Sequence, residues 1–445
     1  MKLKVLGRLD FHLRELLRGT ILAFAHRAAG MAIGFLLSVV VAQILGPHDL
    51  GLYALAGTCA MIATVLGKLG LDNAMLKYAS AGATRQDWGQ VASIYRLGMA
   101  IATAASGVTT ITLVLLAPII AERLFSEPLL TAPIRIMALT IAPNSLVALH
   151  GEMLRSLKLS GAVGLLQGSL PPIAAFSVLG IAVALFGTDL TPSGIAWISV
   201  VAAIGMIFFA LLLWRHNAPQ AKQRESFEAT RLLRTSIPLL WISSLNLIMG
   251  ATDTVMLGIW TTADQVGLYG VAARLAVLVS FPLVAVNTIA APKLAGLHAT
   301  GELSAVDGVA RNTALISFSL SLPLSIFYWL RPELGLSLFG DEFVFAATAL
   351  SLLTAGHLVN AATGPVGNLL MLTGYEKTMR NNIAGCSLLN IVMNIVLIPE
   401  FGISGAAGAT ALSLITMNIV SLIMVYRHLA IIPVPFAPTR TRNRV

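Results

Sequence analysis

The sequence predicts an all-α, polytopic membrane protein with about 12 transmembrane helices in two six-helix bundles. Three observations support this fold class. The 445 residues are 57% hydrophobic and only 11% charged, whereas soluble domains contain about 25% charged residues. Apolar stretches of roughly 20 residues, each long enough to cross a bilayer, recur along the whole chain. The two halves of the chain also resemble each other in sequence.

The chain begins with a basic, amphipathic segment, residues 1–19, in which Phe11, Leu13, Leu16 and Leu17 alternate with basic residues. No small-residue cleavage site follows the first apolar stretch, so we expect a helix on the cytoplasmic membrane surface rather than a signal peptide. Twelve spans are then predicted. They lie near residues 20–45, 51–78, 91–117, 132–154, 162–186, 192–214, 237–260, 266–292, 307–331, 342–371, 379–399 and 403–427.

One long polar connection, residues 215–236, divides these spans into two sets of six. The predicted N-terminal bundle covers residues 20–214 and the C-terminal bundle residues 237–428, followed by a basic tail at 429–445. We interpret the polar connection as a cytoplasmic linker between the bundles, because long polar segments often join domains. A ligand-binding loop is the alternative.

The basic residues lie almost entirely on one side of the predicted membrane. All but six of the 29 Lys and Arg residues fall at the chain ends or in connections that the topology places beside those ends. This asymmetry predicts that both termini are cytoplasmic. The net charge of +9 therefore reflects topology and does not indicate a nucleic-acid partner. The exceptions are Arg123 and Arg331 on the opposite side, and Arg27, Lys68, Arg135 and Arg274 within spans.

An internal repeat relates the two halves. The segment ILGPHDLGLYALA at 44–56 matches WTTADQVGLYGVA at 260–272, and Lys77 matches Lys293 at the same offset. Because each half holds an even number of spans, both insert with the same orientation, which gives a parallel repeat about an axis along the membrane normal. Two bundles facing a central cavity form a transporter architecture. The shared triplet Gly-Leu-Tyr, at 51–53 and 267–269, and the two lysines at the same offset argue against chance similarity.

Arg27 lies within the first span, about seven residues and therefore about 10 Å from its cytoplasmic end. An arginine inside a bilayer costs at least about 2.5 kcal/mol. Gly30, Gly34 and Ser38 share a helical face with Arg27, which predicts that this face meets protein or water. Arg27 either snorkels to the headgroups or lines a cavity. We favour the cavity, because intramembrane ionisable residues usually mark pathways.

Other charged residues within spans have open interpretations. Arg274 and Asp253 lie at similar predicted depth and could pair with each other, either as a structural ion pair or as part of a substrate site. Lys68 and Asp72, four residues apart, form either a solvated helix pair or the rim of an inward mouth. Arg135 lies near the outer interface, where snorkelling is expected.

Enzyme signatures are missing from the sequence. It contains no P-loop, no nucleophile elbow and no HExxH motif, and no outward loop is long enough for a catalytic domain. Cys59 and Cys386 offer neither a disulfide framework nor metal-ligand spacing. We therefore expect a transporter driven by a gradient or by the membrane potential, with no catalytic residue, no metal and no cofactor.

The repeat motifs identify a family resemblance. With LGPHDLGLYALA at 45–56 and DTVMLGIWTTADQVGLYGVAARLA at 253–276, the chain resembles over its whole length the polysaccharide/O-antigen (Wzx-like) flippases of the multidrug/oligosaccharidyl-lipid/polysaccharide exporter superfamily. The motif marks the superfamily better than the substrate. The resemblance implies a MATE-like, V-shaped pair of six-helix bundles that works by alternating access.

The resemblance also implies a function. The expected substrate is an undecaprenyl-diphosphate-linked oligosaccharide, moved from the cytoplasmic to the periplasmic leaflet of the bacterial inner membrane for O-antigen, lipopolysaccharide or exopolysaccharide synthesis. Related flippases carry cations in the central cavity, which implies that role for Arg27, Arg274 and Lys68, with Asp253 as a coupling-ion or ion-pair residue. The expected partners are the lipid-linked oligosaccharide, membrane lipids, and a polysaccharide polymerase and glycosyltransferases.

Two alternatives remain. Drug/cation antiporters of the superfamily also have twelve spans, but they tend to place carboxylates in the cavity, where this chain has Arg27. A membrane glycan polymerase or acyltransferase is more distant, because it would need a large outward loop or paired catalytic residues. Peptidoglycan-precursor flippases have two additional C-terminal helices, and the short basic tail after Tyr426 therefore argues against lipid II as the substrate.

Overall fold

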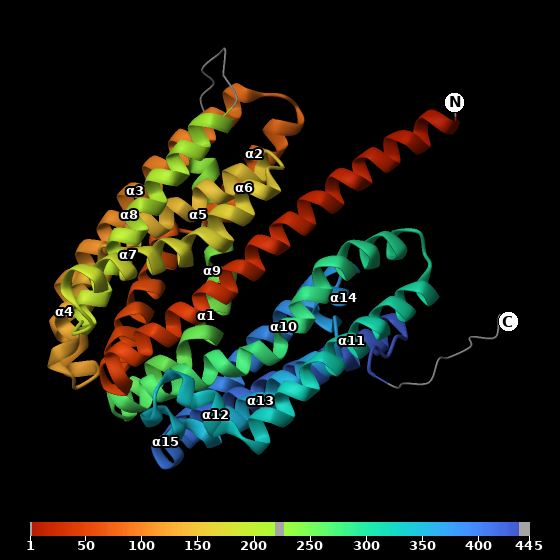
Figure 1. Ribbon diagram of the computed structural model, residues 1–445. Coiled ribbons are helices and arrows are strands. Elements are labelled where there is room, and N and C mark those ends of the chain that lie inside the picture. The colour runs from red at the N-terminus through yellow and green to blue at the C-terminus, as the bar shows by residue number, and fades with distance from the viewer. Residues whose placement is uncertain (1, 219–226, 436–445) are drawn as a thin grey trace. The chain divides into compact units, whose positions relative to one another are not determined.

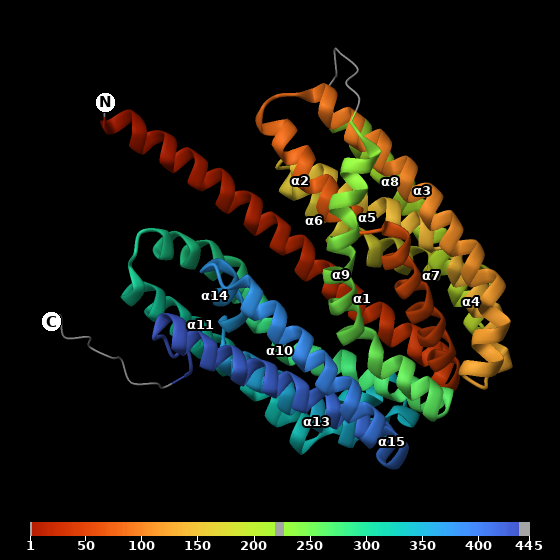
Figure 2. The same cartoon turned by 180° about the vertical axis from the view of Figure 1, so that it is seen from behind.

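The computed structural model describes residues 2–218 and 227–435, with side chains described from residue 25 onward except at 241–243, 245–246 and 248–249. Every regular element in these ranges is helical, which confirms the predicted all-α class. The chain divides into two compact units, Met1–Ile259 and Trp260–Val445 (Figures 1 and 2). Each unit is described separately below.

The first unit is built from nine α-helices with short π- and 3₁₀-helical segments among them, all within the described residues. In chain order they are α1 (Lys2–Lys68), α2 (Leu71–Thr84), α3 (Trp88–Ile119), the π-helix η1 (Ile120–Leu124), the 3₁₀-helix η2 (Pro128–Leu130), α4 (Thr131–Ala138), α5 (Ile141–Ser156), α6 (Ser160–Gly164), the π-helix η3 (Leu165–Ser169), α7 (Leu170–Phe186), α8 (Pro192–Asn217) and α9 (Ala229–Trp260).

Helix α1 turns sharply at Gly46, whose φ of 69° lies in the left-handed region that favours glycine. Pro47 follows and begins the second arm, because its ring fixes a helical φ and removes one backbone donor. This arm ends at Lys68, and α2 starts after a second left-handed glycine, Gly70. The predicted span 51–78 is therefore broken at residues 69–70.

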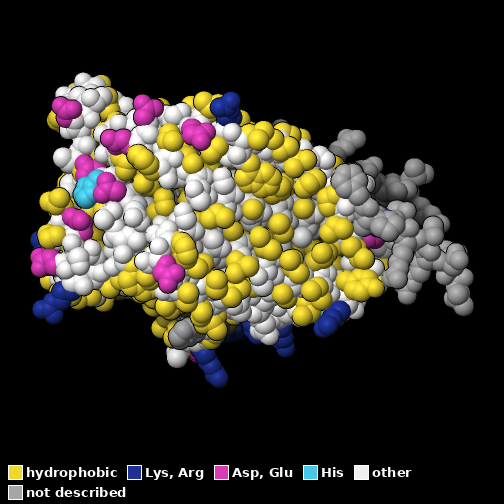
Figure 3. All heavy atoms as spheres, turned by 90° about the horizontal axis from the view of Figure 1, so that it is seen from below, with side chains coloured by type: hydrophobic (Ala, Val, Ile, Leu, Met, Phe, Trp, Pro, Cys, Tyr) yellow, Lys and Arg dark blue, Asp and Glu magenta, His cyan; other side chains and the backbone are white. Residues whose placement is uncertain are grey.

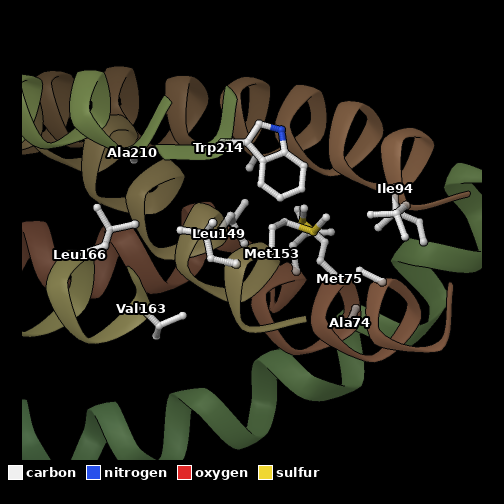
Figure 4. Close-up of a cluster of buried hydrophobic side chains, with 14 of the residues drawn as sticks. Ala74, Met75, Ile94, Leu149, Met153, Val163, Leu166, Ala210 and Trp214 are labelled. Carbon is white, nitrogen blue, oxygen red and sulfur yellow. The ribbon is translucent and has the colours of Figure 1, made fainter. Parts of the chain in front are cut away.

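A buried apolar cluster joins α2, α3, α5 and α8. Trp214, Met153 and Met75, from three of these helices, lie against one another in Figure 4. Leu232 of α9 belongs to the same cluster and is fully buried. Each large buried side chain contributes about 1.5–3 kcal/mol to folding, so this cluster is the main stabilising element of the first unit.

The start of α9 packs on α2, which explains why the first unit extends past the polar linker. A Cβ at Gly70 would overlap the backbone of α9 at Ser236, and the Tyr78 and Thr235 hydroxyls share a hydrogen bond of 2.8 Å. The structure thus groups residues 229–259 with the preceding helices. The sequence instead divides the chain within 215–236, and that division into two six-span halves stays a prediction.

The second unit contains α10 (Ala263–Ala299), α11 (Leu303–Leu330), α12 (Pro332–Leu336), the 3₁₀-helices η4 (Ser337–Phe339) and η5 (Asp341–Ala346), α13 (Ala347–Thr363), α14 (Val366–Leu372) and α15 (Glu376–Leu429). Helix α15 kinks at Gly402, with a φ of 54°, three residues after Pro399. Gly364, with a φ of 67°, separates α13 from α14 inside the predicted span 342–371.

Eight helices in the described residues are long and apolar enough to cross a membrane, and the bent pair α4–α5 makes a ninth. The kinked helices α1 and α15 each supply one further apolar arm, and α9 adds a helix of 32 residues. These lengths leave room for about twelve spans, the predicted number, in the residues that the structure describes. The chain is therefore a multi-pass membrane protein.

The surface is consistent with a lipid environment. Figure 3 shows a face whose broad middle is covered chiefly by hydrophobic side chains, while Asp and Glu gather toward one end. On α3 alone, Val108, Ile111 and Leu115 are each more than 60% exposed. Such large exposed apolar surface would be unfavourable in water and is expected where helices face acyl chains.

Candidate functional site: a cavity with two arginines

A cavity of about 570 Å³ lies within the first unit, and two arginines line it. Arg27 comes from the first arm of α1 and Arg155 from the C-terminal turn of α5. The other lining residues come from α6 and η3; they are Ser160, Val163, Gly164, Gln167 and Gly168. Two cations around one cavity favour an anionic ligand, since otherwise they would repel each other.

Arg27 reaches this cavity because α1 crosses η3 at very short range. A Cβ at Gly30 would overlap the carbonyl oxygen of Gly168. A Cβ at Gly168 would in turn lie 3.3 Å from the backbone nitrogen of Arg27. His26 Nδ1 and Ser169 Oγ share a hydrogen bond of 3.1 Å beside this crossing. Small residues thus permit the helix contact that positions Arg27.

The local sequence LLQGSLPP explains the π-helical turn at η3. Pro171 and Pro172 have no N–H, so the carbonyls of Gln167 and Gly168 lose their ordinary helical donors. The helix widens over Leu165–Ser169 and presents the Gln167 side chain to the cavity. Such π-turns are frequent at functional sites.

Arg155 is held in place by two neighbours. Its Nη2 donates to Gln167 Oε1 at 3.0 Å, and its Nη1 lies 3.1 Å from Glu152 Oε2. The Arg155 side chain is 51% exposed, whereas that of Glu152 is only 13% exposed. The guanidinium therefore faces the cavity, with its carboxylate partner behind it.

Lys68 belongs to a different part of the first unit. It ends the second arm of α1 and lines a separate cavity of about 400 Å³ together with Tyr53 and Asn144. Its Nζ lies 3.1 Å from Asp72 Oδ2, and both side chains are 18% exposed. The predicted Lys68–Asp72 pair is thus present and lies beside a cavity.

Arg274 and Asp253 fall in different units. Arg274 is an exposed residue of α10 in the second unit, and Asp253 is a buried residue of α9, 7% exposed, in the first. Their mutual pairing, and the grouping of Arg274 with Arg27, stay predictions. Arg135, which the sequence places at an interface, is exposed on α4.

His150 and His357, which lie in predicted spans, both have protein partners. His150 Nε2 shares a hydrogen bond of 3.0 Å with Tyr95, and its Nδ1 lies 2.7 Å from the Leu146 carbonyl oxygen. His357 Nδ1 lies 2.8 Å from Ser280 Oγ. Among the described residues, no three His, Cys, Asp or Glu side chains gather in a way that could hold a metal ion.

Sequence reasoning singled out Arg27 but missed Arg155 as a cavity residue. The topology prediction places Arg155 with Lys158 among the basic residues in the connections on the cytoplasmic side. The signal that could have found it is the polar residue Gln167 within an apolar stretch, followed by Gly168 and two prolines. A glutamine in a span needs a hydrogen-bonding partner, and a nearby arginine is a suitable one.

The helical fold and the charged cavity in a multi-pass chain are those of a membrane transporter. The profile of the family described as "Polysaccharide biosynthesis protein" matches residues 16–297, and the chain belongs to this family. Two relatives, Agl15 and AglR of Haloferax volcanii, are named as probable flippases, which supports a transporter rather than an enzyme.

Two relatives are similar to the chain in sequence. The chain is 22% identical to stage V sporulation protein B of Bacillus subtilis over 438 residues, covering 90% of this chain and 82% of that protein. It is 28% identical to the probable low-salt glycan biosynthesis flippase Agl15 of Haloferax volcanii over 163 residues. That second match covers 36% of this chain and 34% of Agl15, so the chain matches only about a third of that relative's length.

Solved structures confirm the MATE-like fold. An inward-facing multidrug resistance MATE family transporter of the MOP superfamily superposes with a TM-score of 0.74 at 12% identity, covering 92% of this chain and 98% of that one. The lipid II flippase MurJ, in an inward closed conformation, gives a TM-score of 0.69 at 16% identity, with 92% and 87% covered. At these identities the likeness establishes the fold alone.

Proposed function

We propose that the protein is a flippase that moves an undecaprenyl-diphosphate-linked oligosaccharide from the cytoplasmic to the periplasmic leaflet by alternating access. The observation that carries this proposal is the cavity with Arg27 and Arg155 on its wall. Membership of the polysaccharide biosynthesis family supports a glycan substrate, and the name of Agl15 refers to a glycan biosynthesis flippase.

The chemistry of a diphosphate suits this cavity. Guanidinium groups donate two parallel hydrogen bonds to phosphate oxygens, which makes arginine the preferred residue for such groups. Opposite unit charges 4 Å apart attract by about 4 kcal/mol at an effective dielectric constant of 20. That attraction offsets the cost of at least about 2.5 kcal/mol for placing Arg27 inside a membrane. Gln167 and Ser160 add neutral hydrogen-bonding groups to the wall.

The membrane potential would favour outward movement. With the interior negative, each negative charge gains about 2.3 kcal/mol per 100 mV on crossing the full field. Arg274 and Lys68 are proposed as further cations on the substrate path, and Asp253 as a partner of Arg274 or a ligand for a coupling cation. A polysaccharide polymerase and glycosyltransferases are proposed as partners in the same process.

The proposed location is the bacterial inner membrane with both termini in the cytoplasm. The asymmetric distribution of Lys and Arg along the chain supports this orientation. In this orientation Arg155, in the last turn of α5, and Lys158, just after it, would lie on the cytoplasmic side. The Arg27 cavity would then open first to the leaflet in which lipid-linked glycans are assembled.

A deletion strain tests the proposal. Undecaprenyl-linked glycan should accumulate on the cytoplasmic side, and wild-type protein should clear it, whereas Arg27→Ala and Arg155→Ala should not. The matched control is Arg135→Ala, which removes an exposed arginine of α4 away from the cavity. Each variant is checked for membrane insertion. Normal glycan export with sensitivity to cationic drugs would instead indicate the antiporter alternative.

A further inference from the structure

Glu152 lies behind the cavity arginine and has no part in the proposed binding of substrate. It precedes Arg155 by three residues on α5, so both side chains fall on the same side of that helix. The carboxylate is mostly buried while the guanidinium is half exposed to the cavity. The distance of 3.1 Å between them is that of a formed ion pair.

The surroundings of Glu152 make its charge costly when Arg155 is engaged elsewhere. The residues that interact with its carboxylate are Asp72 of α2, Lys68 of α1, Arg155 of its own helix and Gln167 of η3. Asp72 repels it and already holds Lys68 at 3.1 Å. Arg155 is therefore the principal neutralising partner of Glu152.

The Glu152–Arg155 pair is suited to exchange. The guanidinium is half exposed, so a ligand in the cavity can reach it, and the ligand must make up the free energy lost when Arg155 leaves its mostly buried carboxylate. A diphosphate carries more charge than one carboxylate and offers more acceptor oxygens to the same guanidinium. Gln167 Oε1 accepts from Arg155 Nη2 at 3.0 Å and so gives the guanidinium a neutral partner on the cavity wall.

We propose that Glu152 is the internal counter-ion of this anion site, a positioning residue that holds Arg155 in the empty cavity and competes with the substrate diphosphate for it. This inference rests on the proposed function, since it assigns a second role at the same site. Competition by a fixed carboxylate weakens binding and speeds release. A flippase needs such release, because a substrate held too tightly would not leave in the second leaflet.

Binding of farnesyl diphosphate to the purified, detergent-solubilised protein tests the inference. Glu152→Gln removes the competing charge and keeps the shape, so we expect its dissociation constant to fall about tenfold relative to wild type. Glu152→Asp keeps the charge and should stay within about twofold of wild type. Glu152→Ala is a second neutral variant. Inorganic pyrophosphate and farnesol distinguish recognition of the diphosphate from recognition of the prenyl chain.

A double-variant cycle separates competition from a structural role. In an Arg155→Ala background, Glu152→Gln should change the affinity for farnesyl diphosphate by less than about twofold, because the carboxylate then has no guanidinium to compete for. Unchanged or weaker binding by both neutral variants would overturn the role of Glu152 while leaving the proposed function intact. A wild-type protein that binds neither farnesyl diphosphate nor pyrophosphate would overturn both.

Discussion

The crossing of α1 over η3 makes Gly30 a position where one methyl group should disturb the site. A Cβ there would overlap the Gly168 carbonyl oxygen and lie 3.2 Å from the Ser169 Cα. Both obstacles are backbone atoms, which cannot rotate away. In Gly30→Ala the two helices must therefore separate by about 1 Å, and overpacking of this kind costs about 1–3 kcal/mol.

The same separation would weaken a second contact. The His26–Ser169 hydrogen bond, 3.1 Å in the structure, would be stretched beyond bonding range, with a further loss of about 1 kcal/mol. The better helix propensity of alanine returns about 0.5–1 kcal/mol. Gly30→Ala should thus lose about 1–3 kcal/mol of stability. Because Arg27 moves with α1, transport should fall further, by up to about 100-fold.

Gly34→Ala is the matched control, because it makes the same change one turn further along α1. Its new Cβ would meet only the Pro172 Cβ at 3.7 Å, an ordinary contact. The assay is the apparent melting temperature of each purified variant, together with clearance of lipid-linked glycan in the deletion strain. Gly30→Ala should be impaired in both, and Gly34→Ala in neither. Equal behaviour of the two variants would refute the claim that this crossing positions Arg27.

Two further predictions concern the packing of the first unit. Lys68→Ala should lower the melting temperature, because Asp72 then loses its partner at 18% exposure, a cost of about 1–2 kcal/mol; Lys68→Met combined with Asp72→Asn should recover part of it. Tyr95→Phe should cost about 1–2 kcal/mol by removing the hydrogen bond to His150, whereas Tyr95→Ala should cost about 3–5 kcal/mol because the stacking on Trp214 is also lost. Equal melting temperatures for the two Tyr95 variants would contradict this assignment.

The fold class could be predicted because a bilayer strongly restricts the backbone structures that can cross it. Every backbone polar group in a membrane must be satisfied within its own helix, so an apolar stretch of about 20 residues predicts a helical span. The matched segments at 44–56 and 260–272 both fall at a break that starts a new helical arm: Gly46–Pro47 in one half, and the gap between α9 and α10 in the other. Repeat matching therefore located real structural boundaries.

The breaks inside predicted spans were not predicted. The sequence stays apolar across Leu69–Gly70 and across Gly364, so hydropathy does not mark either break. A glycine stands at each break, Gly70 in one and Gly364 in the other. At Gly70 the backbone of α9 leaves no room for a Cβ, and a Cβ at Gly364 would overlap with Ala314 of α11. These are tertiary contacts between distant segments, which single-sequence periodicity does not contain.

The site was only half visible in the sequence. Arg27 stands out, because a charged residue in an apolar span demands an explanation. Arg155 does not stand out, because an arginine at a helix end is ordinary in membrane proteins and reports topology. Its cavity role depends on α6 and η3 folding back beside α1, and on the Gly30–Gly168 contact that brings the helices together.

The most direct test of the account is transbilayer movement in reconstituted vesicles. Purified protein is incorporated with undecaprenyl-linked glycan extracted from the deletion strain, and the glycan exposed to a membrane-impermeant oxidant is measured over time. Wild type should make the glycan of the inner leaflet accessible, and Arg27→Ala should leave it protected as in protein-free vesicles, while Arg135→Ala behaves as wild type. Protection that persists with wild-type protein under an imposed membrane potential would contradict the assignment as a lipid-linked oligosaccharide flippase.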